Sequence, residues 1–100
     1  MIVNFTNAFK KDLRKLKDKK LLTKIQQVIE NVEIIVKNLD KDEVPEISNF
    51  SKMAGHVNKY RIRLGNYRIG ITIANNENDN FDIFWFERFL HRKDIYKYFP

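Results

Sequence analysis

The sequence predicts an α+β fold, in which an N-terminal strand and an antiparallel helical hairpin pack on one face of a mainly antiparallel twisted sheet, with a short C-terminal tail or helix. Two stretches lead to this prediction. Residues 60–73 alternate polar and apolar side chains on both sides of Gly65-Asn66, a pattern typical of two strands joined by a tight turn. Residues 21–39 repeat apolar side chains at helical spacing, which indicates a long amphipathic helix.

Length and composition narrow the class of protein. The 100 residues match the size of one domain, so we expect 1–100 to fold as a single unit. A net charge of +6 favours a polyanionic partner such as nucleic acid, or an acidic protein. The chain has no cysteine and only two distant histidines, so we predict no metal or other cofactor. Without a secretory signal or a long apolar run, we expect a cytoplasmic protein with no membrane partner.

The first half of the chain predicts a strand followed by two helices. Residues 1–5 are rich in strand-forming side chains, and Thr6 is a good N-cap for a helix from Asn7 to about Asp18. We interpret the basic side chains of that helix mainly as a solvated face. Lys19-Lys20 leave room only for a tight connection, so the helix over 21–39 is expected to run antiparallel to the first.

The second half predicts a loop, a β-hairpin, a third strand and a tail. A proline and many polar residues predict a loop over 40–58, whose few apolar side chains attach it to the core. The hairpin over 60–73 comes next, followed by a polar turn at 75–80. Residues 81–89 are very apolar and predict a strand that is covered on both sides. Residues 91–98 are too polar for a core strand and close the chain.

One face of the predicted hairpin is basic. With Gly65-Asn66 as the loop, Arg63 lies opposite Arg68 and Arg61 lies opposite Gly70. A like-charge pair across two strands is destabilising, and the missing side chain at Gly70 leaves room for a close approach to the backbone. The face is either an anion site for phosphates or a solvated face that happens to be basic, and we favour the anion site. It carries Lys59, Arg61, Arg63, Arg68 and Thr72.

The tail concentrates a second set of reactive side chains in His91-Arg92-Lys93-Asp94-Ile95-Tyr96. A histidine exchanges protons near neutral pH, an arginine holds phosphate with a planar fork, and a tyrosine stacks on a base or donates a hydrogen bond. Two structural alternatives stay open at this point. His91 could simply form a hydrogen bond at the end of the last strand, and Tyr96, Tyr98 and Phe99 could be a hydrophobic clasp.

Taken together, the N-terminal strand and helical hairpin, the motif Tyr-Arg-Ile-Arg-Leu-Gly-Asn-Tyr-Arg-Ile at 60–69 and the closing motif at 91–96 resemble the RelE/ParE superfamily of type II toxin-antitoxin toxins, on the RelE side. The resemblance covers essentially the whole chain. It implies a metal-independent endoribonuclease that cleaves mRNA, on the ribosome, by attack of the ribose 2′-OH on the adjacent phosphate, and so inhibits translation. It also implies a cognate antitoxin that neutralises the toxin in a hetero-oligomer.

The resemblance assigns roles to particular residues. Arg61 and Arg63 match basic positions of the family's first hairpin strand, and Arg68 matches the arginine of its second strand. Arg92 and Tyr96 match the closing motif. With the hairpin face and the closing motif taken into account, the candidate catalytic residues are Arg61, Arg68, His91 and Tyr96, and the candidate phosphate-binding residues are Lys59, Arg61, Arg63, Arg68 and Arg92.

The sequence also departs from RelE. RelE has lysines at the first-strand positions, one of them a candidate general base, whereas an arginine stays protonated and cannot accept a proton. His91 is therefore the expected group for proton transfer. Leu90 stands near a further arginine of RelE, so one anion contact is expected to be missing.

Two other functions compete with RNA cleavage. The first is a ParE-like toxin that inhibits DNA gyrase, which would use the same fold against a different target. The second is a non-catalytic domain that binds nucleic acid or an acidic partner through the same basic hairpin. The histidine-arginine motif and the three hairpin arginines favour the nuclease.

Overall fold

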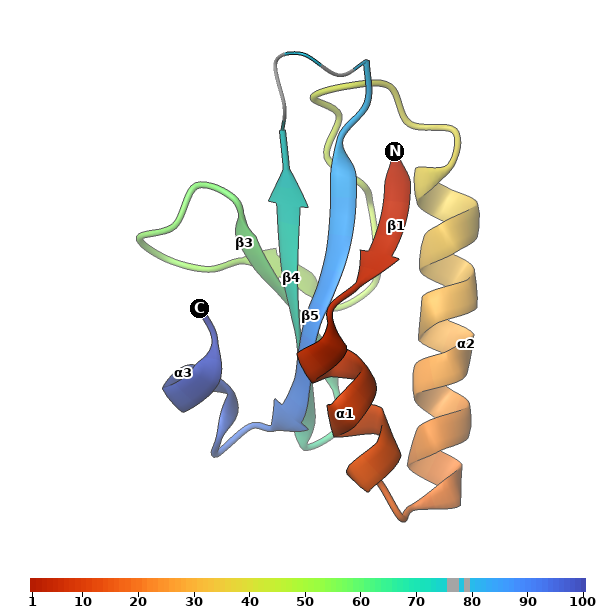
Figure 1. Ribbon diagram of the computed structural model, residues 1–100, viewed down its shortest axis with the longest axis vertical. Helices are drawn as coiled ribbons and strands as arrows, with labels where there is room; N and C mark the ends of the chain where they lie inside the picture. The colour runs from red at the N-terminus through yellow and green to blue at the C-terminus, as the bar shows by residue number, and fades with distance from the viewer. Residues whose placement is uncertain (76–77, 79) are drawn as a thin grey trace.

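A computed structural model describes residues 1–75, 78 and 80–100 of the chain (Figure 1). Its sheet has five strands in the order β1-β5-β4-β3-β2. Strand β1 is parallel to β5, and the other neighbouring strands are antiparallel, which confirms the predicted α+β class. The elements are β1 Ile2–Phe5, α1 Asn7–Lys15, α2 Lys19–Val36, β2 Phe50–Lys52, β3 Lys59–Leu64, β4 Tyr67–Ala74, β5 Ile83–His91 and α3 Ile95–Tyr98.

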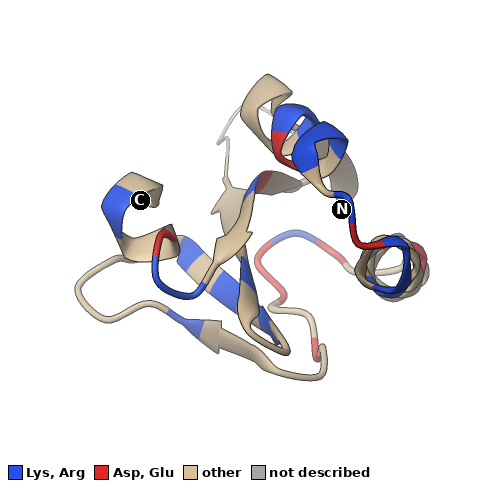
Figure 2. Ribbon diagram, turned by 90° about the horizontal axis from the view of Figure 1, so that it is seen from below, with Lys and Arg blue, Asp and Glu red and all other residues tan. Residues whose placement is uncertain are grey.

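The two faces of the sheet are covered differently. Helices α1 and α2 pack on one face and enclose the main core, which includes Phe9, Ile25, Ile69 and Phe86. Figures 1 and 2 show α3 on the side of the sheet away from α2. A smaller apolar cluster of Met53, Ile95 and Phe99 lies there, with Leu90 packed against it. Among the described residues, no helix has the length and apolar character needed to cross a membrane.

The β3–β4 hairpin has the register that the sequence predicts. Arg63 pairs with Arg68, and Arg61 pairs with Gly70. Gly65 has a φ of 57°, a left-handed conformation that glycine adopts without a steric penalty. The alternating isoleucines of both strands therefore enter the main core, and the arginines point to the opposite face.

The helix boundaries differ from the prediction because of a cap. Helix α1 ends at Lys15 and not near Asp18. The Asp18 carboxylate accepts a hydrogen bond of 3.1 Å from the Leu21 N–H and is the N-cap of α2. The predicted connection Lys19-Lys20 is therefore the first turn of α2. Helix α2 ends at Val36, before the predicted end at 39.

Two strand assignments are also corrected. The predicted loop over 40–58 contains a short strand, β2, which pairs with β3 and is packed through the ring of Phe50, stacked 4.8 Å from that of Tyr60. Strand β5 runs to His91, so this histidine belongs to the sheet and not to the tail. The tail does form the short helix α3. Of the predicted turn at 75–80, residues 76, 77 and 79 lie outside the described part of the chain.

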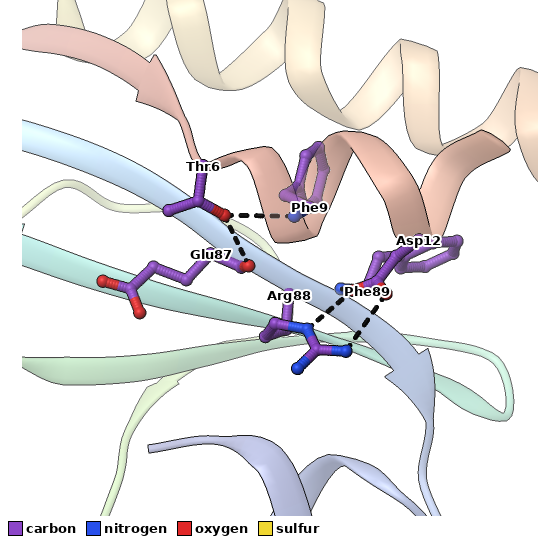
Figure 3. A network of polar contacts seen from close by, with 6 residues as sticks. All are labelled: Thr6, Phe9, Asp12, Glu87, Arg88 and Phe89. Carbon is purple, nitrogen blue, oxygen red and sulfur yellow. Dashed lines mark hydrogen bonds and ion pairs between the residues drawn. The ribbon is translucent and has the colours of Figure 1, made fainter. Parts of the chain in front are cut away.

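Beyond the end of β1, Thr6 and helix α1 provide the hydrogen-bond partners for the backbone of β5 (Figure 3). The last pair of β1 and β5 joins Phe5 to Phe86, so the backbone of β5 needs other partners beyond it. The Thr6 hydroxyl donates to the Glu87 carbonyl at 2.7 Å, and the Asp12 carboxylate accepts from the Phe89 N–H at 2.9 Å. The side chains of Thr6, the N-cap of α1, and of Asp12 within α1 thus form hydrogen bonds with backbone groups of β5 that β1 does not reach.

Asp12 also holds a guanidinium. Its carboxylate accepts from Nε of Arg88 at 2.9 Å and from Nη2 at 3.1 Å (Figure 3). This hydrogen-bonded pair raises the pKa of Arg88 above the ordinary arginine value. The Asp12 side chain is only 5% exposed, so its removal leaves a guanidinium and a backbone N–H without their acceptor.

We predict that Asp12→Ala lowers the free energy of unfolding by about 2–4 kcal/mol, because it leaves the buried Phe89 N–H and the partly buried Arg88 guanidinium without their acceptor. Urea denaturation measures the loss. Glu46→Ala, at an exposed carboxylate, is the matched control and is expected to stay within about 0.5 kcal/mol of the wild type. Equal losses in the two variants would show that Asp12 does not fasten α1 to the sheet.

Candidate nucleic-acid interface

The arginine face, defined here as Arg61, Arg63, Arg68 and Arg92 with Lys59, lies on the side of the sheet opposite the main core. The first three are brought together by the register of β3 and β4. Nη1 of Arg68 donates to the carbonyls of Gly65 and Tyr67, both at 2.9 Å, so its side chain is folded over the hairpin turn.

The cations of this face lie close enough to affect one another. Burial, followed by the charge of Arg63, lowers the pKa of Arg68 from the ordinary arginine value. The charges of Arg61 and Arg92 act in the same direction, and Tyr96 acts in the opposite one. Arginine nevertheless stays protonated at any physiological pH. The face is therefore a cluster of positive charges with a standing preference for an anion.

Helix α3 brings Tyr96 onto the arginine face. Nη1 of Arg61 donates a hydrogen bond to the Tyr96 hydroxyl, and the guanidinium carbon lies 5.9 Å from the centre of the tyrosine ring. Nε of Arg61 donates to the Ser51 hydroxyl at 3.3 Å. Arg61 is thus held between β2 and α3, and the Tyr96 side chain beside it remains exposed.

Phe99 fills the space that the absent side chain of Gly70 leaves. A Cβ atom at position 70 would lie 2.7 Å from the Phe99 ring, closer than two carbon atoms can approach. The predicted close approach to the backbone at Gly70 is therefore made by the chain's own tail. Nζ of Lys59 lies 5.8 Å from the centre of the same ring and donates to the Thr72 hydroxyl at 2.8 Å.

The predicted clasp forms through Phe99 and Ile95, which are buried, and not through the tyrosines. Tyr96 and Tyr98 are 54% and 60% exposed. The Arg88 guanidinium lies 5.5 Å from the centre of the Tyr98 ring. The tail is also tied to the hairpin turn, because the Arg92 N–H donates to the Asn66 carbonyl at 2.7 Å.

His91 is not brought onto the arginine face. It pairs with Tyr67, and the two rings lie 5.5 Å apart on the face that α1 covers, whereas Arg68 pairs with Leu90 on the opposite face. The cause is a bulge: Gly70 pairs with Arg88 and Ile71 with Phe86, so Glu87 is an extra residue that reverses the alternation of β5.

His91 forms a hydrogen bond at the end of the last strand, which is the alternative to a catalytic role that the sequence left open. Its Nδ1 accepts a hydrogen bond of 3.1 Å from the Lys93 N–H at the end of the strand. Its side chain lines a cleft of about 500 Å³ together with Asp12 and Lys15. A role for His91 in proton transfer stays a prediction.

Leu90 and Ser51 also lie beside side chains of the arginine face. Leu90 lies beside Arg68 and packs on the cluster under α3, so this position contributes apolar contact in place of an anion contact. The sequence gives no sign of Ser51, which accepts a hydrogen bond from Arg61, because the three residues of β2 are too few to show an alternating pattern. Among the residues that the structure describes, no group of three or more His, Asp or Glu side chains is arranged to hold a metal ion.

The chain is similar to known proteins over nearly its whole length. The model of the ParE toxin family of type II toxin-antitoxin systems (parDE) matches residues 3–96. Toxin RelE3 of Methanocaldococcus jannaschii is 37% identical over 101 residues, covering all of both chains. The toxin in a crystal structure of a RelB-RelE antitoxin-toxin complex from Methanococcus jannaschii is 33% identical, with a TM-score of 0.66, over 96% of this chain and 98% of that one.

The fold and these matches define the class of protein as a toxin of a type II toxin-antitoxin system. The chain belongs to the RelE/ParE superfamily, and its full-length similarity to a RelE toxin confirms the resemblance to the RelE branch.

We predict that Gly70→Ala and Phe99→Ala are energetically coupled. An added Cβ at position 70 overlaps the Phe99 ring, so Gly70→Ala alone should displace the tail and destabilise the protein by about 1–3 kcal/mol. In a Phe99→Ala background the overlap is gone, and the same change should cost much less. Denaturation of the wild type, both single variants and the double variant measures the coupling, and additive losses would refute the contact.

Proposed function

We propose that this toxin is a metal-independent endoribonuclease that cleaves mRNA on the ribosome and thereby inhibits translation. The observation that carries the proposal is the contact between Arg61 and the exposed Tyr96 beside the cluster of arginines. This contact supports the proposal because a tyrosine can stack or donate a proton and a guanidinium binds phosphate well. Full-length similarity to a RelE toxin supports the same function.

The proposed reaction is an intramolecular transesterification. The ribose 2′-oxygen forms a bond to the adjacent phosphorus while the bond to the 5′-oxygen breaks, which gives a 2′,3′-cyclic phosphate and a 5′-hydroxyl. The 2′-hydroxyl loses its proton to a base, and the departing 5′-oxygen gains one. Negative charge increases on the phosphate oxygens in the transition state, where fixed guanidinium groups stabilise it most.

The residues divide these tasks. Arg61, Arg63 and Arg68 hold the phosphate and stabilise the developing charge, with Lys59 and Arg92 at the margin of the face. Tyr96 stacks on a nucleobase or protonates the departing oxygen. None of the arginines can serve as the base. We retain His91 as the hypothesis for that role, and because its ring lies on the other face, action there requires a rearrangement of residues 91–94.

We propose that the partner of this chain is a cognate antitoxin, with which it forms a hetero-oligomer. The similar RelE of Methanococcus jannaschii was solved as a RelB-RelE complex. An acidic antitoxin segment would match the arginine face in charge, because among the described residues no carboxylate forms an ion pair with its cations.

Gyrase inhibition is the second candidate, because the matching family model is that of a ParE toxin. One experiment separates the two. Purified toxin is added to ribosomes programmed with a defined mRNA, new 5′ ends are mapped by primer extension, and gyrase supercoiling is assayed in parallel. New mRNA ends with unaffected supercoiling support the nuclease. Inhibited supercoiling without new ends would replace it by the ParE-like function.

We predict that Arg61→Gln and Arg68→Gln each reduce the rate of mRNA cleavage by about 10²–10³-fold, the usual effect of removing one group that stabilises transition-state charge. Lys37→Gln, at an exposed lysine of the α2 C-cap, is the control for a lost charge and should cleave like the wild type. Single-turnover cleavage measures all three. Wild-type rates in both arginine variants would remove the arginine face from the reaction.

His91→Ala tests the proton-transfer hypothesis separately. If His91 is the base, the variant should lose cleavage by about 10²–10⁴-fold, and the pH profile of its residual rate should differ from that of the wild type. A variant with an unchanged rate and pH profile would assign His91 to the structure of the strand end alone.

A further inference from the structure

A second concentration of positive charge lies on the helical side of the molecule. We define the basic helical turn as residues 10–24, which include most of α1, the link and the first third of α2. It holds eight lysines and arginines and two aspartates, a net charge of +6. The whole chain also has a net charge of +6, because the other 85 residues carry eleven basic and eleven acidic side chains.

The two aspartates in this segment do not offset its charge. The Asp12 side chain points toward the sheet, where its carboxylate accepts hydrogen bonds from Arg88 and from the Phe89 N–H. The Asp18 carboxylate accepts a hydrogen bond from the Leu21 N–H at the start of α2. All eight basic residues are exposed, and in the described part of the chain none of them forms an ion pair.

The fold gives no reason for this arrangement. Like charges four residues apart on a helix destabilise it, and such pairs occur at Lys10 with Arg14, Lys11 with Lys15 and Lys20 with Lys24. A helix face that only needs to be soluble can carry lysines and glutamates together, without this repulsion between like charges. The uncompensated charge is therefore better explained by a polyanionic partner than by solvation alone.

The chemistry of the surface selects the kind of polyanion. The segment contains no aromatic residue and only one arginine, Arg14, so it has little with which to stack on unpaired bases. Its leucines pack toward the core, and none of its large apolar side chains is exposed for insertion into a lipid surface. What remains is a set of lysine and arginine heads carried by two helices, which suits the regular phosphate backbone of a double helix.

Because the proposed function acts on RNA, and to that extent resting on it, we propose that the basic helical turn binds the phosphate backbone of double-helical RNA, as a surface separate from the arginine face. Figure 2 shows the basic stretches of α1 and α2 apart from those of the strands. The two surfaces lie on opposite sides of the sheet, so the toxin can hold structured RNA on one side and a single strand on the other. The proposal goes beyond cleavage, because it concerns an RNA that the protein does not cut.

The test uses a blunt RNA duplex of about 16 base pairs, 2′-O-methylated so that it cannot be cleaved, with binding followed by fluorescence anisotropy at several KCl concentrations. Lys11→Gln/Lys15→Gln is compared with Lys37→Gln/Lys52→Gln, which removes the same charge from exposed positions elsewhere. We expect the first pair to lose affinity on the order of 10–100-fold near 0.1 M salt, with a salt slope shallower by about 2. The second pair should lose less than about threefold, since only screened long-range charge is removed.

Three results would overturn the proposal. The first is no salt-dependent binding of the duplex, and the second is an equal loss in the two pairs. The third is binding that survives Lys11→Gln/Lys15→Gln but is abolished by Arg61→Gln/Arg63→Gln, which would assign the duplex to the arginine face. Vesicles of phosphatidylglycerol are tested in parallel, and binding to them without binding to the duplex would identify a membrane surface instead. None of these readouts depends on mRNA cleavage.

Discussion

The pairing of β3 with β4 is the constraint on which the site depends. Its register is held by the burial of Ile62, Ile69 and Ile71 in the main core, because a slip by one residue would turn these side chains to the other face. The same register sets Arg63 against Arg68, an arrangement that is unfavourable by itself. Burial of the isoleucines thus stabilises a cluster of like charges that would not assemble alone.

The tail fastens to this cluster through aromatic rings and not through carboxylates. Lys59, Arg61 and Arg88 each lie within 6 Å of the centre of a ring from the last five residues, at 5.8, 5.9 and 5.5 Å. A cation above an aromatic ring is stabilised but keeps its charge. Lys59 and Arg61 therefore hold the tail in place and still attract an anion, which an ion pair with an acidic tail would prevent.

The sequence predicted most of what local periodicity determines. The hairpin register, the two long helices and the arginine face follow from alternation, helical spacing and one two-residue turn. Two features depend on non-local structure. Strand β2 is three residues long and forms only because β3 offers it an edge. The bulge at Glu87 reverses β5, so Phe89 and His91 face α1, although unbroken alternation from Phe84 and Phe86 would place them on the other side.

We propose that RNA binds on the face made by β3, β4 and the tail. The six arginines of the chain give separate signals: Arg61, Arg63 and Arg68 lie on that face with Arg92 near Arg68, Arg14 lies on α1, and Arg88 is paired with Asp12. The most direct measurement is the change in the arginine Nε–H NMR signals when a short, 2′-O-methylated single-stranded RNA is added. We expect the Nε–H signals of Arg61, Arg63 and Arg68 to shift in a saturable, salt-sensitive way and the signal of Arg88 to stay in place. Unmoved signals from these three, with shifts confined to Arg14, would contradict it.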